Sequence, residues 1–485
     1  MPKKFIKYLD RSRGRLASSH AQFLALVGFL TIVFFTGGSS RDDVQSLIFL
    51  RPLSFIFGAY ALTCMTCEEW RGRLFPLYIA IAFAGLMLLQ LIPLPPEIWV
   101  TLPGREIFAD IASMAGLEQP WRPLTLSPSR TLNSLFSIAV PMSAMMLYLN
   151  IEERHRKQMI VILILFAGIS ALWAMLQLAG SARGPLYLYR ITNSGAAVGL
   201  FANRNHQAIF LATTIVMLGW YAGSLAATAK LGALKFYGSI AAIFIIVPLL
   251  FITGSRAGLV LMVPALAAAM AMIYFGRYAM ENQILFNRSR AAKAKISVRH
   301  LILLGSSTLI ILVVLLSIYL SRSLAFDRLV NRSAVEEIRT QLLPILTNMT
   351  IDYFPWGSGF GTFEFVYRIY EPRDMLSPTY LNQAHNDWLQ IPIEGGLPAI
   401  AIAAGILIWA TAQMLVLFKA WHSSRYTKYA ATMAASALIF FLAGSIGDYP
   451  LRVPSLITVF ALLACFFVDS VRKVEQSTIR NSASG

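Results

Sequence analysis

The chain has 485 residues, of which 57% are hydrophobic and only 13% are charged, and its formal net charge is +17. Soluble globular domains carry about 25% charged residues, so this composition excludes a soluble protein and indicates one that crosses a membrane many times. The basic charge does not indicate nucleic-acid binding, because no basic stretch is interleaved with aromatic residues as such surfaces require.

Twelve apolar segments are long enough to cross a hydrocarbon core of about 30 Å as helices. They lie near residues 21–37, 46–66, 74–93, 132–149, 158–179, 205–226, 237–253, 257–276, 300–320, 397–418, 429–446 and 453–470. The predicted fold is therefore an all-α polytopic membrane protein of about twelve transmembrane helices, in line with these segment lengths.

Alternate threading from the basic N-terminal segment places every lysine and the whole net charge of +17 on the cytoplasmic side, as the positive-inside rule requires. The other side carries arginine but no lysine. Arginine binds phosphate oxygens bidentately and stays charged, although positive-inside selection alone also accounts for the missing lysines. The predicted parts are a cytoplasmic tail (1–20), helices 1–9 (21–320), a large periplasmic loop with a short re-entrant helix (321–396), helices 10–12 (397–470) and a cytoplasmic tail (471–485).

The first polar cluster precedes the sixth span on the outward side. Asn203, Arg204, Asn205 and His206 stand immediately before an apolar helix. Either asparagine can cap that helix, whose N-terminus offers free N–H groups and a partial positive charge to an anion. A simple cap with an interfacial arginine is the alternative, but a cap does not need four polar residues in a row.

The second cluster is the short turn GSRAG between the seventh and eighth spans. It holds Arg256 close to the membrane surface, where a charge is costly unless it is paired or faces a polar cavity. Snorkelling of the side chain towards lipid head groups is the alternative.

The large outward loop contains an amphipathic helical segment with Arg339 and then a glycine-rich turn, PWGSGFG. This turn is not a dinucleotide-binding fingerprint, since no strand precedes it and no Rossmann unit follows.

The third cluster, QAHNDWLQIPIEGG, begins the approach to the tenth span. We expect a helix from near His385 to Ile393 that is interrupted at Pro392 and at Gly395–Gly396. Irregular backbone at this depth is tolerated where it lines a polar cavity. A histidine at such a rim suits general-base catalysis, and His206 is the other histidine predicted on the outward side.

Several groups could support His385. Asn386, Asp387 and Glu394 follow it in the sequence, but helical geometry puts neither carboxylate clearly on the His385 face. Asp448 and Arg452, between the last two spans, pair either with each other or with this site. The spacing of His, Asp and Glu fits no metal-ligand set, so we expect no metal and no cofactor.

Together, the segments GLFANRNHQA, GSRAG, EEIRTQLLPILTNMTIDYFPWGSGFGTF, QAHNDWLQIPIEGG and DYPLRVP resemble the bacterial O-antigen ligase and O-antigen polymerase superfamily. The resemblance implies a GT-C-like, inverting and metal-independent glycosyltransferase of the inner membrane, acting at the periplasmic face on undecaprenyl-diphosphate-linked glycans. It implies that Arg204 and Arg256 bind the diphosphate and that His385 is the base. Arg339 matches a loop arginine of the family, but the tryptophan that often follows is absent here.

The resemblance leaves the acceptor open. We favour a polymerase of O-antigen or exopolysaccharide repeats over a ligase that transfers glycan to lipid A core, and a protein O-glycosyltransferase comes third. The implied partners are the lipid-linked donor, a glycan or lipid acceptor, membrane lipids, a chain-length regulator and polysaccharide export proteins, but no nucleic acid. A lipid-linked glycan transporter is the alternative of a different class. It predicts charges spread through the membrane interior and an internal repeat, and the sequence shows neither.

Overall fold

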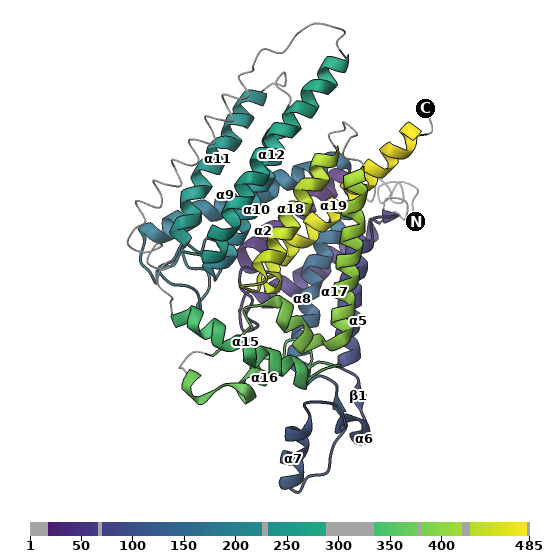
Figure 1. Cartoon of the computed structure of the whole chain (residues 1–485), viewed down its shortest axis with the longest axis vertical. Helices are drawn as coiled ribbons and strands as arrows, with labels where there is room; N and C mark the ends of the chain where they lie inside the picture. Colours follow the sequence, from purple (N-terminus) through teal and green to yellow (C-terminus); the bar gives the residue numbers. More distant parts are fainter. Residues whose placement is uncertain are drawn as a thin grey trace, which may run out of the picture.

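The computed structural model describes residues 18–65, 70–225, 231–287, 334–376, 380–419 and 427–482, and this part of the chain is mostly helical, with two short strands (Figure 1). Helices occupy each predicted span that falls in these ranges. They are α2 (Ser19–Thr36), α3 (Leu47–Thr63), α5 (Phe75–Gln90), α8 (Pro128–Leu149), α9 (Glu153–Ala179), α10 (Arg204–Gly223), α11 (Gly232–Thr253), α12 (Arg256–Asn287), α17 (Asp387–Lys419), α18 (Thr427–Gly444) and α19 (Pro454–Ser482). The predicted span near 300–320 lies outside the described residues, so the count of twelve stays a prediction.

Among the described residues, seven helices are long and apolar enough to cross a membrane, namely α2, α8, α9, α11, α12, α17 and α19. Three shorter apolar helices, α3, α5 and α18, lie among them. Helix α10 occupies the interior of the bundle, because its side chains are buried along nearly its whole length. The protein is therefore a multi-pass membrane protein with a helix packed at its centre.

Helices α10 and α12 run parallel in close contact. A Cβ atom on Gly258 of α12 would lie 2.4 Å from the Cβ of Ala208, near the start of α10. Near the other end, a Cβ atom on Gly223 of α10 would lie 2.3 Å from the carbonyl oxygen of Met272 of α12. Small residues allow such close helix approach in membranes. Both helices therefore begin at the same end of the bundle.

The ends of other helices meet at that same end. The carbonyl oxygen of Gly37, just after α2, accepts hydrogen bonds from the backbone and hydroxyl of Ser455 at the start of α19. The backbone N–H of Asp387 donates to the carbonyl oxygen of Ser445, just after α18. Figure 1 shows the smaller elements gathered here, away from the last turns of α19. They are β1 (Pro93–Leu94), α6 (Pro96–Trp99), α7 (Glu106–Met114), β2 (Arg122–Pro123), α15 (Ala334–Asp352), α16 (Phe363–Tyr370), η1 (Arg373–Met375) and η3 (Pro450–Arg452).

The glycine-rich turn fixes the start of α17 in place. The backbone N–H groups of Ser358 and Gly359 donate to the carbonyl oxygens of Ile393 and Glu394. A Cβ atom on Gly357, whose φ is +79°, would lie 2.5 Å from the carbonyl oxygen of Glu394, so a larger residue cannot approach so closely. The turn therefore has a packing role.

Two boundaries differ from the sequence prediction. Helix α17 starts at Asp387, continues past Pro392, and changes direction only at Gly396, where φ is 58° and ψ is −154°. Pro392 therefore does not interrupt this helix. The next turn is held by hydrogen bonds that the carbonyl oxygens of Ile393 and Glu394 accept from outside the helix. Helix α19 continues to Ser482, so residue 470 is not the end of a helix. Residues 1–17 and 288–333 lie outside the described part.

Candidate active site

Asp448 lies at the centre of the polar groups at this end of the bundle. It stands in the connection between α18 and α19 and is fully buried. Its Oδ2 atom accepts hydrogen bonds from the amide groups of Asn205 (2.5 Å) and Asn203 (3.3 Å), and its Oδ1 atom accepts from the backbone N–H of Tyr449 (2.9 Å). Asn203 is also the N-cap of α10. A buried carboxylate is thus supplied with donors from two distant parts of the chain.

Two histidines face the same oxygen of Asp448. The Nε2 atom of His206 lies 3.6 Å from Oδ1 and the Nδ1 atom of His385 lies 3.5 Å from it. The ring of Tyr449 packs edge-on against both imidazoles. Burial alone would raise the pKa of Asp448, but the two imidazoles outweigh this effect and hold that pKa well below its usual range. Asp448 is therefore an anion that both histidines share.

The two imidazoles differ in exposure, which separates their roles. The His206 side chain is 1% exposed, whereas that of His385 is 24% exposed. Because Nδ1 of His385 faces Asp448, its Nε2 atom is the ring nitrogen turned away from that carboxylate. His385 also has φ +52°, in the left-handed region that non-glycine residues rarely adopt, and such strain is typical of functional positions.

Arg452 is held by the two carboxylates that were candidates to orient His385. Its Nε atom lies 3.2 Å from Oδ1 of Asp387, and its Nη1 atom lies 3.0 Å from Oε2 of Glu394. Asp387 also accepts from the hydroxyl of Ser445 (3.0 Å). Burial alone would lower the pKa of Arg452, but the two carboxylates outweigh this effect and hold that pKa above its usual value. Asp387 and Glu394 therefore fix the α18–α19 connection against α17, and Asp448 takes the position beside His385.

The start of α17 is itself capped and braced. The side-chain oxygen of Asn386 accepts from the backbone N–H of Leu389 (3.2 Å). The Oε1 atom of Glu394 accepts from the backbone N–H of Phe363 (3.2 Å) and from the amide of Gln390 (3.1 Å). The polar residues that follow His385 thus order the helix that carries them.

Arg204 and Arg256 are the first residues of the parallel helices α10 and α12. The backbone N–H of Arg204 donates to the side chain of Asn193 (3.0 Å), and the hydroxyl of Ser255 accepts from the backbone N–H of Gly258 (3.1 Å). Both arginines are partly exposed. Two guanidinium groups and the positive ends of two helix dipoles are therefore at one end of the bundle, an arrangement suited to an anion. Arg339 lies on α15, but its side chain is outside the described part.

The O-antigen ligase family matches residues 241–404. Those residues belong to the O-antigen ligase family. The matched region runs from α11 into α17 and includes Arg256, Arg339, His385 and Glu394. No curated protein sequence matches the chain significantly. The matched region thus indicates a membrane enzyme of the O-antigen ligase and polymerase type.

The fold completes the O-antigen ligase region with residues from outside it. Arg204 and His206 precede the matched segment, and Asp448 and Arg452 follow it. Within the described residues, no group of three or more His, Cys, Asp or Glu side chains could share a metal ion.

Other supporting residues had no clear signal in the sequence. Arg105 is fully buried and donates to the carbonyl oxygens of Pro103, Leu124 and Gly357. Gln90, at the end of α5, donates to the carbonyl oxygen of Glu394 (2.9 Å). The only sequence signal for a role of Gln90 was its place as a polar residue at the end of an apolar segment. Nothing in the sequence distinguished Arg105 from an exposed arginine.

Proposed function

We propose that the protein is a glycosyltransferase that polymerises oligosaccharide repeats carried on undecaprenyl diphosphate, at the periplasmic face of the bacterial inner membrane. The observation that carries the proposal is the position of His385. It is partly exposed, backed by the buried carboxylate of Asp448 at 3.5 Å, and located at the bundle end where α10 and α12 begin with arginine.

The chemistry requires a base and a site for the leaving group. The Nε2 atom of His385 takes the proton from an acceptor hydroxyl, and the hydroxyl oxygen then forms a bond to the anomeric carbon of the donor sugar. The bond from that carbon to the diphosphate oxygen breaks, and its electron pair leaves with the diphosphate. Attack from the face opposite the leaving group inverts the anomeric centre.

Fixed charges support both ends of this reaction. Asp448 stabilises the imidazolium that forms on His385, in the way that a buried carboxylate supports a catalytic histidine elsewhere. Arg204, Arg256 and the helix N-termini stabilise the negative charge that develops on the diphosphate. Groups that are already oriented need no reorganisation during the reaction, which makes such stabilisation effective.

A ligase that transfers the glycan to lipid A core would use the same site and differ only in its acceptor. The test is to purify the full-length protein and add polyprenyl-diphosphate-linked repeat units alone. We expect a ladder of longer glycans. Transfer only after lipid A core is added would identify a ligase instead. Movement of intact lipid-linked glycan across vesicles without transfer would overturn the enzyme proposal in favour of a transporter.

A further inference from the structure

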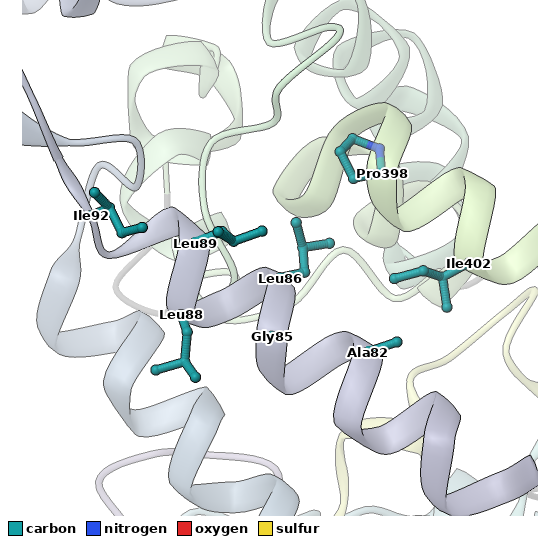
Figure 2. A pocket seen from close by; sticks show the side chains of 8 residues that line it. All are labelled: Ala82, Gly85, Leu86, Leu88, Leu89, Ile92, Pro398 and Ile402. Atoms are coloured by element: carbon teal, nitrogen blue, oxygen red, sulfur yellow. The ribbon is translucent and has the colours of Figure 1, made fainter.

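An apolar groove of about 680 Å³ lies between α5 and α17 (Figure 2). Its lining consists of Ala82, Gly85, Leu86, Leu88, Leu89, Ile92, Pro398 and Ile402. Figure 2 shows Leu86 and Ala82 of α5 facing Pro398 and Ile402 of α17 across it. The volume is in the range of ligand pockets, and the lining offers a ligand only apolar side chains.

Glycine creates part of the space. A Cβ atom added to Gly85 would meet no other atom within 4 Å. Leu88 and Leu89 are more than half exposed, so this face of α5 is not covered by another described helix. Among the described residues, nothing closes the groove on its outer side, and an apolar opening of this kind suits the lipid chains of a membrane.

One end of the groove lies next to residues that support the candidate active site. Pro398 follows Glu394 by one helical turn, just beyond the change of direction at Gly396. Gln90 follows Leu86 by one turn on α5, and its buried amide donates to the carbonyl oxygen of Glu394. The side chain of Glu394 binds Arg452. The residues that end the groove are thus bonded to the residues that hold the site.

The groove lies on a different side of the bundle from the two arginines. Helix α5 packs against α8 and α17, whereas α10 packs against α12, α11 and α18. In Figure 1, α11 and α12 stand at the left and α5 and α17 at the right, with α18 and α19 between them. The connection that carries Asp448 joins α18 to α19. The catalytic groups therefore lie between the arginine side and the groove side.

We propose that this groove binds the hydrocarbon chain of the acceptor, the second lipid-linked molecule in the reaction. This inference rests on the proposed function, in which the diphosphate of the donor, with its own lipid, is held at Arg204 and Arg256. An acceptor that is also anchored in the membrane then needs a second approach to His385. The groove ends beside Glu394, whose side chain binds Arg452 at the site.

Lipid chains in the bilayer are as apolar as the lining of the groove, so moving a chain into it gives no hydrophobic gain. The groove contributes to binding through its shape and through the orientation it gives the chain. A bound chain gains close packing and brings its head group to the edge of the site beside Glu394. Filling the groove should consequently weaken acceptor binding while leaving the chemical step intact. The expected effect is a higher KM for an acceptor with a long hydrocarbon chain, at an unchanged kcat.

Gly85→Leu is the test variant, since the new side chain has free space and leucine is a better helix former than glycine. Gly168→Leu is the matched control, because Gly168 is exposed on α9 and its Cβ would also meet nothing within 4 Å. The acceptors are one oligosaccharide carried as a long-chain or a short-chain alkyl glycoside. These glycosides have no diphosphate leaving group and so cannot act as donors.

We expect Gly85→Leu to raise the KM for the long-chain acceptor about fivefold or more, a loss of about 1 kcal/mol of binding free energy, because the leucine side chain occupies space that the hydrocarbon chain would fill. The KM for the short-chain acceptor and the kcat should stay at the wild-type value, and Gly168→Leu should match wild type throughout. Unchanged KM values in Gly85→Leu, an equal rise for both acceptors, or a rise in the KM for the donor instead would overturn the inference.

A binding measurement separates this inference from the proposed function. A long-chain alkyl glycoside with a photoreactive group in its chain should label peptides containing residues 82–92 and 398–402 in the wild-type protein. Labelling should fall in Gly85→Leu but not in Gly168→Leu. If the groove is labelled while the wild-type protein transfers no glycan, the proposed function fails and the groove assignment stands. If transfer occurs and the groove is not labelled, the groove assignment fails.

Discussion

Replacing Asp448 by asparagine removes the charge that His385 and His206 share while keeping the size of the side chain. The two oxygens of Asp448 each accept hydrogen bonds, from Tyr449 on one side and from Asn205 and Asn203 on the other. An asparagine must direct its N–H₂ group at one of these donors, so the substitution costs a hydrogen bond as well as a charge.

The size of the effect follows from the distance between the groups. A carboxylate about 4 Å from an imidazolium contributes roughly 4 kcal/mol where the effective dielectric constant is about 20. His385 is partly exposed, so we discount this to about 3 kcal/mol, which corresponds to a decrease of roughly 10²-fold in rate. That lies within the range of about 10²–10⁴ that general-base catalysis contributes.

The assay is the initial rate of glycan transfer by purified full-length protein, with kcat and KM measured separately for the acceptor. The kcat should fall about 10²-fold, while the acceptor KM stays close to that of wild type. Asp110→Asn, at an exposed position on α7, is the control and should keep full activity. A folded Asp448→Asn protein whose kcat is within about twofold of wild type would refute the role assigned to Asp448.

Three further predictions follow from the same geometry. Arg256→Ala should lower kcat/KM for the donor about 10²-fold, as loss of a preorganised charge does elsewhere, and Arg256→Lys should recover only part of it because lysine cannot bind bidentately; transfer at the wild-type rate by an equal amount of Arg256→Ala protein would contradict this. Arg105→Met should lower the free energy of unfolding by about 3 kcal/mol, because three carbonyl oxygens, one buried and two partly buried, lose their donor; thermal unfolding measures it, and an unchanged Tm would show that Arg105 has no structural role. The folded-state pKa of Asp448 lies below its unfolded value, so its contribution to stability is present above about pH 4 and is lost as the pH falls further; the Tm difference between wild type and Asp448→Asn should shrink as the pH falls below about 4, and a difference that grows below that pH would contradict the assignment.

The helices could be predicted from sequence because the membrane leaves few alternatives. A long apolar segment without charge must satisfy its backbone internally, and a helix does so. Helix α10 is the instructive case. Its segment is apolar enough to be recognised as a span, yet its position at the centre of the bundle depends on Gly219 and Gly223, which allow α12 to approach closely. Nothing local in the sequence specifies which helices those glycines contact.

The sequence indicated several residues of the candidate site but not how they pair. Polar groups at the ends of apolar segments indicated His385, Arg256 and Asp448, because such groups are costly near a membrane. The hydrogen bond between Asn205 and Asp448 joins residues 243 positions apart. The spacing of apolar residues along the sequence does not predict contacts between such distant positions. Sequence spacing offered Asp387, Glu394 and Asp448 as possible partners of His385 without deciding between them, and the fold brings Asp448 to it.

The most direct test of the account is a structure of the full-length protein with a polyprenyl diphosphate bound. The account predicts that the diphosphate lies between the guanidinium groups of Arg204 and Arg256, on the same end of the bundle as Nε2 of His385. A diphosphate bound at the opposite end, or at this end without contact to either arginine, would contradict it.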